Sequence, residues 1–271
     1  MARIAILQMT SGIDPEENLA SIEAAARQAA AGGASVLFTP EMSVLLDRKR
    51  ERARGWIESE APHAAVRRLG TAAGAAGIDI ALGSMPVASP PRWANRSHYF
   101  SALARAPVTY DKIHMFDVEL STGESWRESN AYEPGREVVT VEDTPLGRLG
   151  LTVCYDLRFP ALFEALGRRC CDAIAVPAAF TVPTGKAHWH VMLRARAIEA
   201  SAFVIAAAQV GAHADGRETY GHSLVVDPWG EVLLDMQEEP GLGFCDLDRE
   251  RIAKVRNQVP ALANRRDIAD L

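Results

Sequence analysis

Short apolar runs alternate with longer alanine-rich stretches in the first third of the chain, and this alternation restricts the fold more than any other feature. Residues 2–8 (ARIAILQ) and 35–40 (SVLFTP) are rich in strand-forming side chains. Residues 15–33 between them have helical periodicity, acids near the start and a glycine pair at the end. A second helical stretch, 61–76, precedes another strand-like run at 78–84. Strands that alternate with helices predict an α/β fold.

The remainder of the chain contains more strands. Strand-like segments follow one another at 95–110, and residues 147–169 form a strand, a turn and a helix. Residues 172–180 predict a strand and 185–200 a helix, and the last third is rich in strands with a hairpin turn at ProTrpGly. We expect one domain over 1–271, with helices on the outer faces of two mixed sheets. The alternation is also compatible with a pseudo-symmetric division into halves.

Composition excludes several classes of protein. The 271 residues suffice for one sizeable core, and 29 Lys and Arg are spread among 35 Asp and Glu, for a net charge of -6. No basic stripe is present to bind phosphates, so we expect no nucleic-acid partner. The N-terminus lacks a signal-peptide pattern and no segment has the length of a membrane span, which favours a cytoplasmic protein without a membrane partner.

The four cysteines, Cys154, Cys170, Cys171 and Cys245, have neither the density of a disulfide framework nor the spacing of a metal site. We therefore expect four reduced thiols and no metal. The adjacent pair Cys170 and Cys171 raises the alternative of a thiol redox enzyme. However, neighbouring side chains point apart, and a disulfide between them is strained.

Cys154 is the strongest candidate nucleophile. It ends the apolar run GLTV and is followed at once by YDLRFP, where a helix is predicted to begin. A sharp turn between strand and helix exposes a side chain, and backbone N–H groups at the helix start stabilise a thiolate or an oxyanion. The alternative is a buried structural cysteine, since free cysteine is among the most buried residue types.

A cysteine nucleophile needs a base, and the histidines offer no clear one. His188 and His190 are two residues apart on a predicted helix, and His114 lies in DKIHMF. None has a neighbouring Asn or Asp in a pattern typical of a Cys–His pair. We interpret all three as structural or surface residues.

Glu41 and Lys112 each lie at the end of an apolar run, SVLFTPE and VTYDK respectively. Strand ends carry the functional groups of layered α/β folds, so a carboxylate, an amine and the thiol of Cys154 are candidates to meet in one pocket. Each charge taken alone is equally consistent with a surface residue beyond its strand.

Together these segments resemble the nitrilase superfamily of carbon–nitrogen hydrolases, which carry a catalytic Glu, Lys and Cys in this order. The matching stretches are LFTPEMS with Glu41, YDKIHMFDVEL with Lys112, and GLTVCYDLRFP with Cys154. The likeness continues through RESNAYEPG, PAAFTVPTGKAHWHVMLRARAIE and YGHSLVVDPWGEVL. It implies a four-layer α-β-β-α sandwich.

Within the superfamily, DKIHMFDVEL, RESN and AFTVPTGKAHW are similar to the Nit-related branch that includes deaminated glutathione amidases. The ω-amidases, which act on α-ketoglutaramate and α-ketosuccinamate, share much of this pattern. One departure is AlaProVal at 106–108, between strand-like segments at 97–105 and 109–113, where relatives commonly have a glycine-containing turn. We expect a local loop difference there, with a possible effect on a pocket rim.

The resemblance implies a role for each matching residue. Glu41 is the general base toward Cys154 and then toward water, and its buried position predicts a raised pKa. Lys112 and the backbone N–H of Tyr155 hold the oxyanion, and the Lys112 charge favours the thiolate. Glu128 in RESN orients Lys112 and the substrate, although without the resemblance it reads as a surface acid.

Two further residues are implied to bind substrate. Arg158 is suited to a carboxylate because its planar fork makes two parallel hydrogen bonds, although pairing with Asp156 or another acid is an equal alternative. Thr181, in AFTVPTG, is a candidate partner for a substrate oxygen.

The implied reaction is acyl transfer from a small carboxylated amide to sulfur, loss of ammonia or an amine, and hydrolysis of the thioester by water. It needs no metal or organic cofactor. The favoured substrate is deaminated glutathione, and the alternatives are an ω-amide of a 2-oxo acid, an N-carbamoyl amino acid or a nitrile. A catalytically silent binding protein is the alternative of another class. The resemblance also implies a homodimer or higher homo-oligomer.

Overall fold

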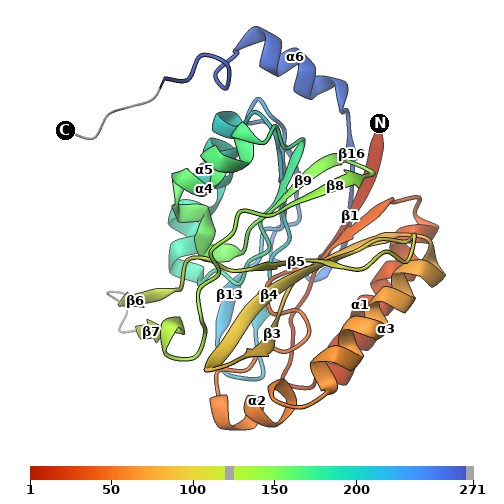
Figure 1. The fold of residues 1–271 in the computed structure, drawn as a ribbon, viewed down its shortest axis with the longest axis vertical. Coiled ribbons are helices and arrows are strands. Elements are labelled where there is room, and N and C mark those ends of the chain that lie inside the picture. The colour runs from red at the N-terminus through yellow and green to blue at the C-terminus, as the bar shows by residue number, and fades with distance from the viewer. Residues whose placement is uncertain (120–124, 267–271) are drawn as a thin grey trace.

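The computed structural model describes residues 1–119 and 125–266, so Leu120, which ends the motif YDKIHMFDVEL, lies outside the described residues. Two six-stranded mixed sheets pack face to face (Figure 1). The first has the order β16 (Gly241–Leu247), β1 (Ala2–Gln8), β2 (Val36–Phe38), β3 (Asp79–Ser89), β4 (Arg92–Phe100), β5 (Val108–Asp111). The second has the order β15 (Val232–Asp235), β14 (Leu224–Val226), β11 (Phe203–Ala206), β10 (Ala173–Ala175), β9 (Gly147–Leu151), β8 (Thr140–Thr144).

The two sheets repeat one pattern of strand directions. From β16 to β5 the neighbouring strands pair antiparallel, parallel, parallel, antiparallel and antiparallel. From β8 to β15 the same series recurs. The pseudo-symmetric halves anticipated from the strand and helix alternation are therefore present in the topology.

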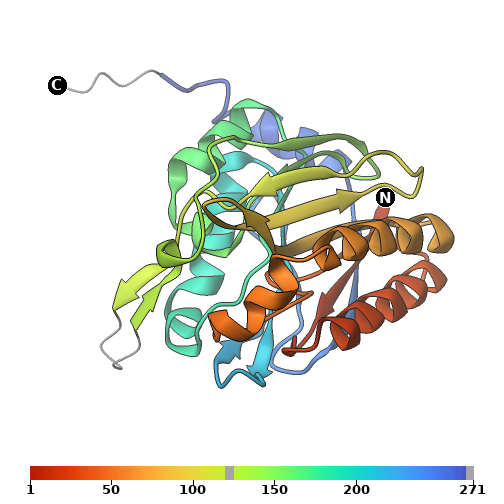
Figure 2. The same cartoon turned by 60° about the horizontal axis from the view of Figure 1, so that its bottom comes forward.

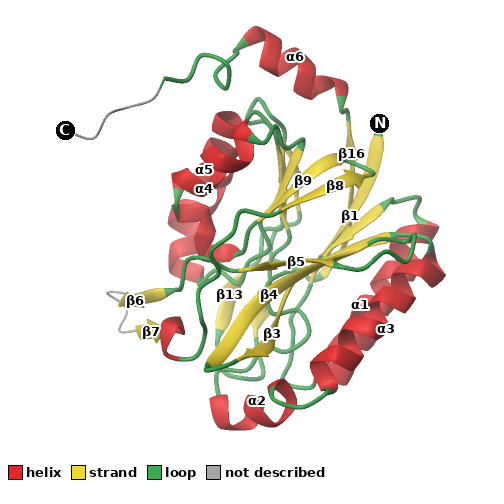
Figure 3. Cartoon of the chain, in the orientation of Figure 1, coloured by secondary structure: helices red, strands yellow, loops and turns green. Residues whose placement is uncertain are grey.

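Helices cover the outer face of each sheet (Figures 1 and 3). Helices α1 (Pro15–Ala31) and α3 (Ala61–Ala76) lie side by side over the first sheet, and α4 (Pro160–Arg168) and α5 (Val182–Ala200) over the second. Local signals set the ends of these helices: the Asp14 side chain accepts the backbone N–H of Glu16, and Gly77 ends α3 with a left-handed φ of 67°. The predicted four-layer α-β-β-α sandwich is confirmed.

The main core lies between the sheets and extends under α4 and α5. Phe38 from the first sheet and Ile205 from the second are almost fully buried in it, as are Trp189 and Leu193 of α5. Ile198 lies on another side of that helix. Ile198 is 51% exposed, because five residues at about 100° each turn it well away from Leu193.

Other elements had no clear pattern in the sequence. They are the helices α2 (Arg50–Ile57) and α6 (Glu250–Gln258), the hairpins β6 (Asp117–Glu119) with β7 (Ser125–Arg127) and β12 (Val210–Ala212) with β13 (Glu218–Tyr220), and the 3₁₀ helices η1 (Glu128–Asn130) and η2 (Cys154–Arg158). The β6–β7 hairpin projects from the body of the molecule (Figures 1 and 2). In the described part of the chain, no helix combines the length and apolar character needed to cross a membrane.

The expected ProTrpGly hairpin is present, because β14 and β15 pair antiparallel around a turn in which Gly230 has a φ of 88°. The strand expected at 97–105 ends earlier, since β4 stops at Phe100. The loop that contains Pro107 follows, and none of its residues lines the main cavity of the protein. The AlaProVal segment therefore lies outside the cavity lining.

Candidate active site

Three side chains from distant segments share one cavity at the carboxyl ends of the strands. Glu41 follows β2 and Cys154 follows β9, one from each sheet, and Lys112 follows β5. The cavity has a volume of about 270 Å³ and is lined by all three. The facing sheets bring their strand ends together, and this is why a carboxylate, an amine and a thiol meet.

Lys112 lies between two carboxylates. Its Nζ atom is 2.9 Å from Oε1 of Glu41, and it is 2.8 Å and 3.1 Å from the two carboxylate oxygens of Glu128. The lysine is only 1% exposed. Burial acts to lower the pKa of Lys112, but the two neighbouring carboxylates raise it well above its ordinary value, so the amine is a cation.

Glu41 is fixed by donors on both carboxylate oxygens. Besides Lys112, the Nδ2 of Asn95 donates to Oε1 at 2.9 Å and the backbone N–H of Ala179 donates to Oε2 at 3.0 Å. The sequence reading predicted a raised pKa for this buried acid, and that prediction is wrong. Burial does act to raise the pKa of Glu41, but the charge of Lys112 and the hydrogen bonds from Cys154, Lys112 and Asn95 lower it below its ordinary value.

Cys154 lies in the predicted sharp turn between β9 and α4, which forms an elbow in the chain. Its φ is 49°, a left-handed conformation unusual for a residue other than glycine, and its backbone N–H donates to the carbonyl of Pro177 at 2.8 Å. Burial and the adjacent Glu41 carboxylate raise the pKa of the thiol well above its ordinary value, and Lys112 offsets this only in part. Lys112 favours the thiolate, as the resemblance implied, but burial and Glu41 outweigh it, so the resting group is a thiol.

The backbone beside the nucleophile is held in place by Asp156. Its buried carboxylate accepts the backbone N–H of Val153 at 2.9 Å, the hydroxyl of Tyr110 at 2.6 Å, and the backbone N–H and ring of His114 at 3.0 Å and 2.7 Å. The N–H of Tyr155 donates to no other group in the described ranges. The elbow is thus rigid and leaves one backbone donor free beside the sulfur.

Glu128 occupies the first turn of η1, just after the β6–β7 hairpin, and is not a surface acid. Besides Lys112, its carboxylate accepts the backbone N–H of Phe116 at 2.7 Å and the Nδ2 of Asn95 at 3.1 Å. These bonds fix Glu128 as a second carboxylate partner of the lysine, beside Glu41.

Arg158 and Thr181 also line the cavity. The guanidinium of Arg158 contacts Nδ1 of His188 at 3.3 Å and lies 5.5 Å from the ring centroid of Phe180. No ion pair between described residues includes it, so the suggested pairing with Asp156 is wrong. Thr181 precedes α5, and its hydroxyl lies 2.8 Å from that of Thr184.

Sequence reasoning missed two residues of the site. Asn95, in the middle of β4, bridges Glu41 and Glu128, and nothing in its local pattern distinguishes it from other strand residues. Trp126 also lines the cavity, and the guanidinium groups of Arg48 and Arg217 lie 5.0 Å and 5.2 Å from the centroid of its ring.

The other candidates lie elsewhere. No histidine lines the cavity, as expected. His114 instead contacts the Asp156 carboxylate that holds the backbone beside Cys154. Cys170 is exposed and Cys171 is buried, both as free thiols. Nothing in their placement connects them to the cavity.

The model of the carbon–nitrogen hydrolase family matches residues 3–257. A protein of Yersinia enterocolitica named deaminated glutathione amidase is 40% identical over 100% of this chain and 95% of its own length.

Two solved structures extend the likeness to the fold. The NitFhit protein of Caenorhabditis elegans superposes with a TM-score of 0.90 at 33% identity, over 98% of this chain and 66% of that one. A mutant amidase from Nesterenkonia sp. AN1, with the acetamide moiety of fluoroacetamide covalently added at its active-site cysteine, has a TM-score of 0.83 at 27% identity, over 98% and 94% of the two chains.

Proposed function

This chain belongs to the carbon–nitrogen hydrolase family and is a cysteine-dependent amidase; from that premise we propose that it hydrolyses deaminated glutathione through a thioester on Cys154. The observation that carries the proposal is the contact of one buried cation, Lys112, with the carboxylate of Glu41 beside that thiol. The name of the full-length Yersinia relative supports the substrate.

The first half of the reaction begins from a neutral thiol and an ionised acid. Glu41 takes the proton of Cys154 as the sulfur attacks the amide carbon, and the oxyanion that forms is held by Lys112 and the free N–H of Tyr155. Glu41 then gives that proton to the amide nitrogen. The C–N bond breaks, the amine leaves, and an acyl thioester remains.

The second half uses the same groups with water as the nucleophile. Glu41 takes a proton from the water as its oxygen attacks the thioester carbon, and Lys112 again meets the oxyanion. The C–S bond breaks, the acid product forms, and the proton returns to sulfur. These steps are carried by protein groups and water alone.

Glu128 positions Lys112 in this scheme. A lysine with a single carboxylate partner is free to move with Glu41, whereas a second carboxylate partner holds the ammonium group where the oxyanion develops. The rigidity of such donors is what makes them effective in catalysis.

The acyl part of the proposed substrate carries a 2-oxo acid, and two groups on the cavity wall suit it. The guanidinium of Arg158 has no carboxylate partner in the described chain. It can donate two parallel hydrogen bonds to a substrate carboxylate. The hydroxyl of Thr181 is a donor for a neighbouring oxygen.

The leaving group allows a direct test. Deaminated glutathione has a keto group in place of the amino group of glutathione, so its hydrolysis releases cysteinylglycine, whereas α-ketoglutaramate releases ammonia. We expect the highest kcat/KM for deaminated glutathione in a panel that also holds α-ketoglutaramate, an N-carbamoyl amino acid and a nitrile. A higher value for another member replaces the proposed substrate. Normal turnover by Cys154→Ala rejects the mechanism itself.

We also propose a homodimer formed through the exposed face of α5. Val191 and Ile198 on this helix are 71% and 51% exposed, and Trp229 in the adjacent β14–β15 turn is 50% exposed. The Nε of Arg194 donates to the carbonyl of Gly230 at 2.7 Å, which ties the turn to the helix. Sedimentation of Ile198→Glu as a monomer, against a dimeric parent chain, is the expected result; a monomeric parent contradicts the proposal.

A further inference from the structure

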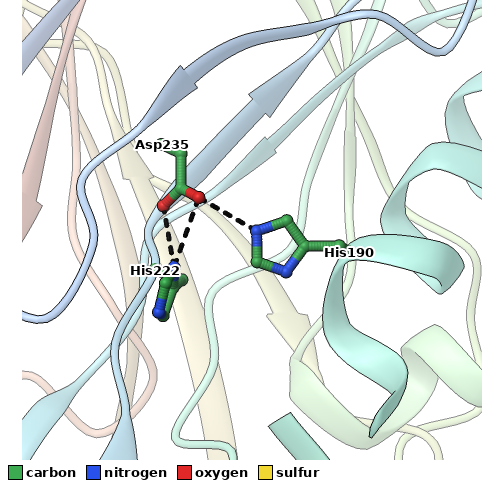
Figure 4. Close-up of side chains that lie close together, drawn as sticks. All are labelled: His190, His222 and Asp235. Atoms are coloured by element: carbon green, nitrogen blue, oxygen red, sulfur yellow. Dashed lines mark hydrogen bonds and ion pairs between the residues drawn. The ribbon is translucent and has the colours of Figure 1, made fainter. Parts of the chain in front are cut away.

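Outside the catalytic cavity, two histidines and an aspartate converge on one point (Figure 4). His190 projects from α5, His222 lies in the segment between β13 and β14, and Asp235 ends β15. The Nε2 of His190 is 3.0 Å from Oδ2 of Asp235, and the Nδ1 of His222 is 3.0 Å from Oδ1 of the same carboxylate. None of the three lines the cavity that holds Cys154.

The chemistry of this trio is that of a transition-metal site. Its three ligand atoms all lie within 4.8 Å of one another. Zinc binds imidazole nitrogen and carboxylate oxygen at about 2.0–2.1 Å in tetrahedral geometry, which separates neighbouring ligand atoms by roughly 3.3 Å. The two nitrogen-to-oxygen distances are already close to this value. Calcium and magnesium prefer oxygen ligands, so the pair of imidazoles favours zinc and its neighbours.

The backbone around the trio is held in position. His222 has a left-handed φ of 54°, its N–H donates to the carbonyl of Gln237 at 2.7 Å, and its carbonyl accepts the Nε1 of Trp189 at 2.7 Å. The N–H of Gln237 donates to Oδ1 of Asp235 at 2.9 Å. Two of the ligands are therefore fixed relative to each other before any ion binds.

Neighbouring side chains complete the surroundings. The ring of Tyr220 stacks on that of His222 with centroids 4.4 Å apart and an angle of 20° between planes. Oε1 of Glu238 lies 4.0 Å from Nε2 of His222, on the side of the ring away from Asp235.

We propose that His190, His222 and Asp235 bind one divalent transition-metal ion, with zinc the best fit, and leave a fourth position open to water. The ion binds the Nε2 of His190, the Nδ1 of His222 and one oxygen of Asp235, and any proton on those nitrogens is released to solvent. It joins α5, the helix that begins beside Thr181, to β15 of the second sheet. The proposal is independent of the amidase reaction.

The test uses the untagged full-length chain with Cys154→Ala, so that the catalytic thiol cannot bind the metal. After chelator treatment, titration calorimetry with Zn²⁺ is expected to give one equivalent per chain. Co²⁺ is expected to give the visible absorption of a tetrahedral site without a thiolate charge-transfer band. In this host, His190→Gln and Asp235→Asn should each weaken Zn²⁺ binding by at least about tenfold.

His188→Gln is the matched control, because this histidine lies on the same helix outside the trio. Circular dichroism shows whether each variant is folded, and Zn²⁺ is expected to raise the Tm of the host and of the control but not that of His190→Gln. Absence of saturable binding to the host, equal affinity in all variants, or a thiolate band with Co²⁺ each overturns the proposal.

Discussion

The Nζ atom of Lys112 lies 2.9 Å from Oε1 of Glu41 in a part of the cavity where the lysine is 1% exposed and the glutamate 5%. Two opposite charges so deeply buried are stable only together, because each compensates the desolvation of the other. The pair also fixes the resting protonation, an ionised acid next to a neutral thiol. A base and an oxyanion donor are thus set side by side before the substrate arrives.

Replacement of this lysine should affect both activity and stability. Lys112→Met leaves Glu41 and Glu128 close together without the cation between them, and the loss of one partner of a buried pair costs about 3–5 kcal/mol. We expect the free energy of unfolding in urea to fall by that amount and amide hydrolysis to be lost. Lys254→Met, at a side chain 59% exposed, is the control and should change neither quantity. Unchanged stability in Lys112→Met contradicts the ion pair.

The dependence of activity on pH follows from the directions of two pKa shifts. The pKa of Glu41 lies below its ordinary value of 4.5 and that of Cys154 well above its ordinary value of 9.0. The active form, with ionised Glu41 and a neutral thiol, therefore predominates between these two values. We expect kcat/KM to be flat over this interval and to fall only below it on the acid side. An acid limb centred well above 4.5 shows that the carboxyl is protonated at rest.

The lowered pKa of Glu41 also makes the free energy of unfolding depend on pH, with a definite sign. Because folding lowers the pKa of Glu41, the unfolded chain binds more protons on the acid side. The contribution of this group to stability is complete above its unfolded value of 4.5 and is lost as the pH falls through the lower folded value. Urea unfolding at a series of pH values measures it. Glu41→Gln should reduce the acid dependence, and an identical dependence in both chains assigns it to other carboxylates.

The main features of the fold were predictable because their signals are local. Helix α3 has a glycine stop, and β2 and β9 are short apolar runs followed by polar residues, so Glu41 and Cys154 stood out at the strand ends. Helix α6 did not stand out, because only Ile252 and Val255 on it are buried and the other residues, apart from Ala253, are polar. A helix with so narrow an apolar face leaves little periodicity to detect.

Neither the role of Asn95 nor the direction of the Glu41 pKa shift could be predicted from local sequence patterns, and the reason is the same for both. Asn95 contacts two carboxylates only because β4 pairs beside β5 and its carbonyl accepts the N–H of Lys112 at 3.0 Å. The pKa of Glu41 depends on a sum over partners that tertiary structure brings together, and burial alone predicts the wrong sign. Both are properties of the assembled site.

Substitution of Arg158 separates binding from chemistry. Arg158→Lys keeps the charge and removes the two-pronged geometry, so we expect KM for deaminated glutathione to rise by about tenfold with little change in kcat. Steady-state kinetics with propionamide, which has no carboxylate, provides the control and should be nearly unaffected. An equal loss with both amides indicates a role in holding the elbow through Tyr155, whose ring centroid lies 5.8 Å from the guanidinium group.

Asp156 is expected to be the most sensitive structural position of the site. The fully buried carboxylate accepts hydrogen bonds from Val153, Tyr110 and His114, and Asp156→Ala leaves these donors without an acceptor. Each unsatisfied buried donor costs about 1–3 kcal/mol, so we expect a loss of roughly 3–5 kcal/mol in the free energy of unfolding. Since the Cys154 elbow depends on these bonds, alkylation of the thiol by iodoacetamide should change in rate even where the variant is folded. Asp172→Ala, at a half-buried acid just before β10, is the control. Equal effects from the two changes contradict a special role for Asp156.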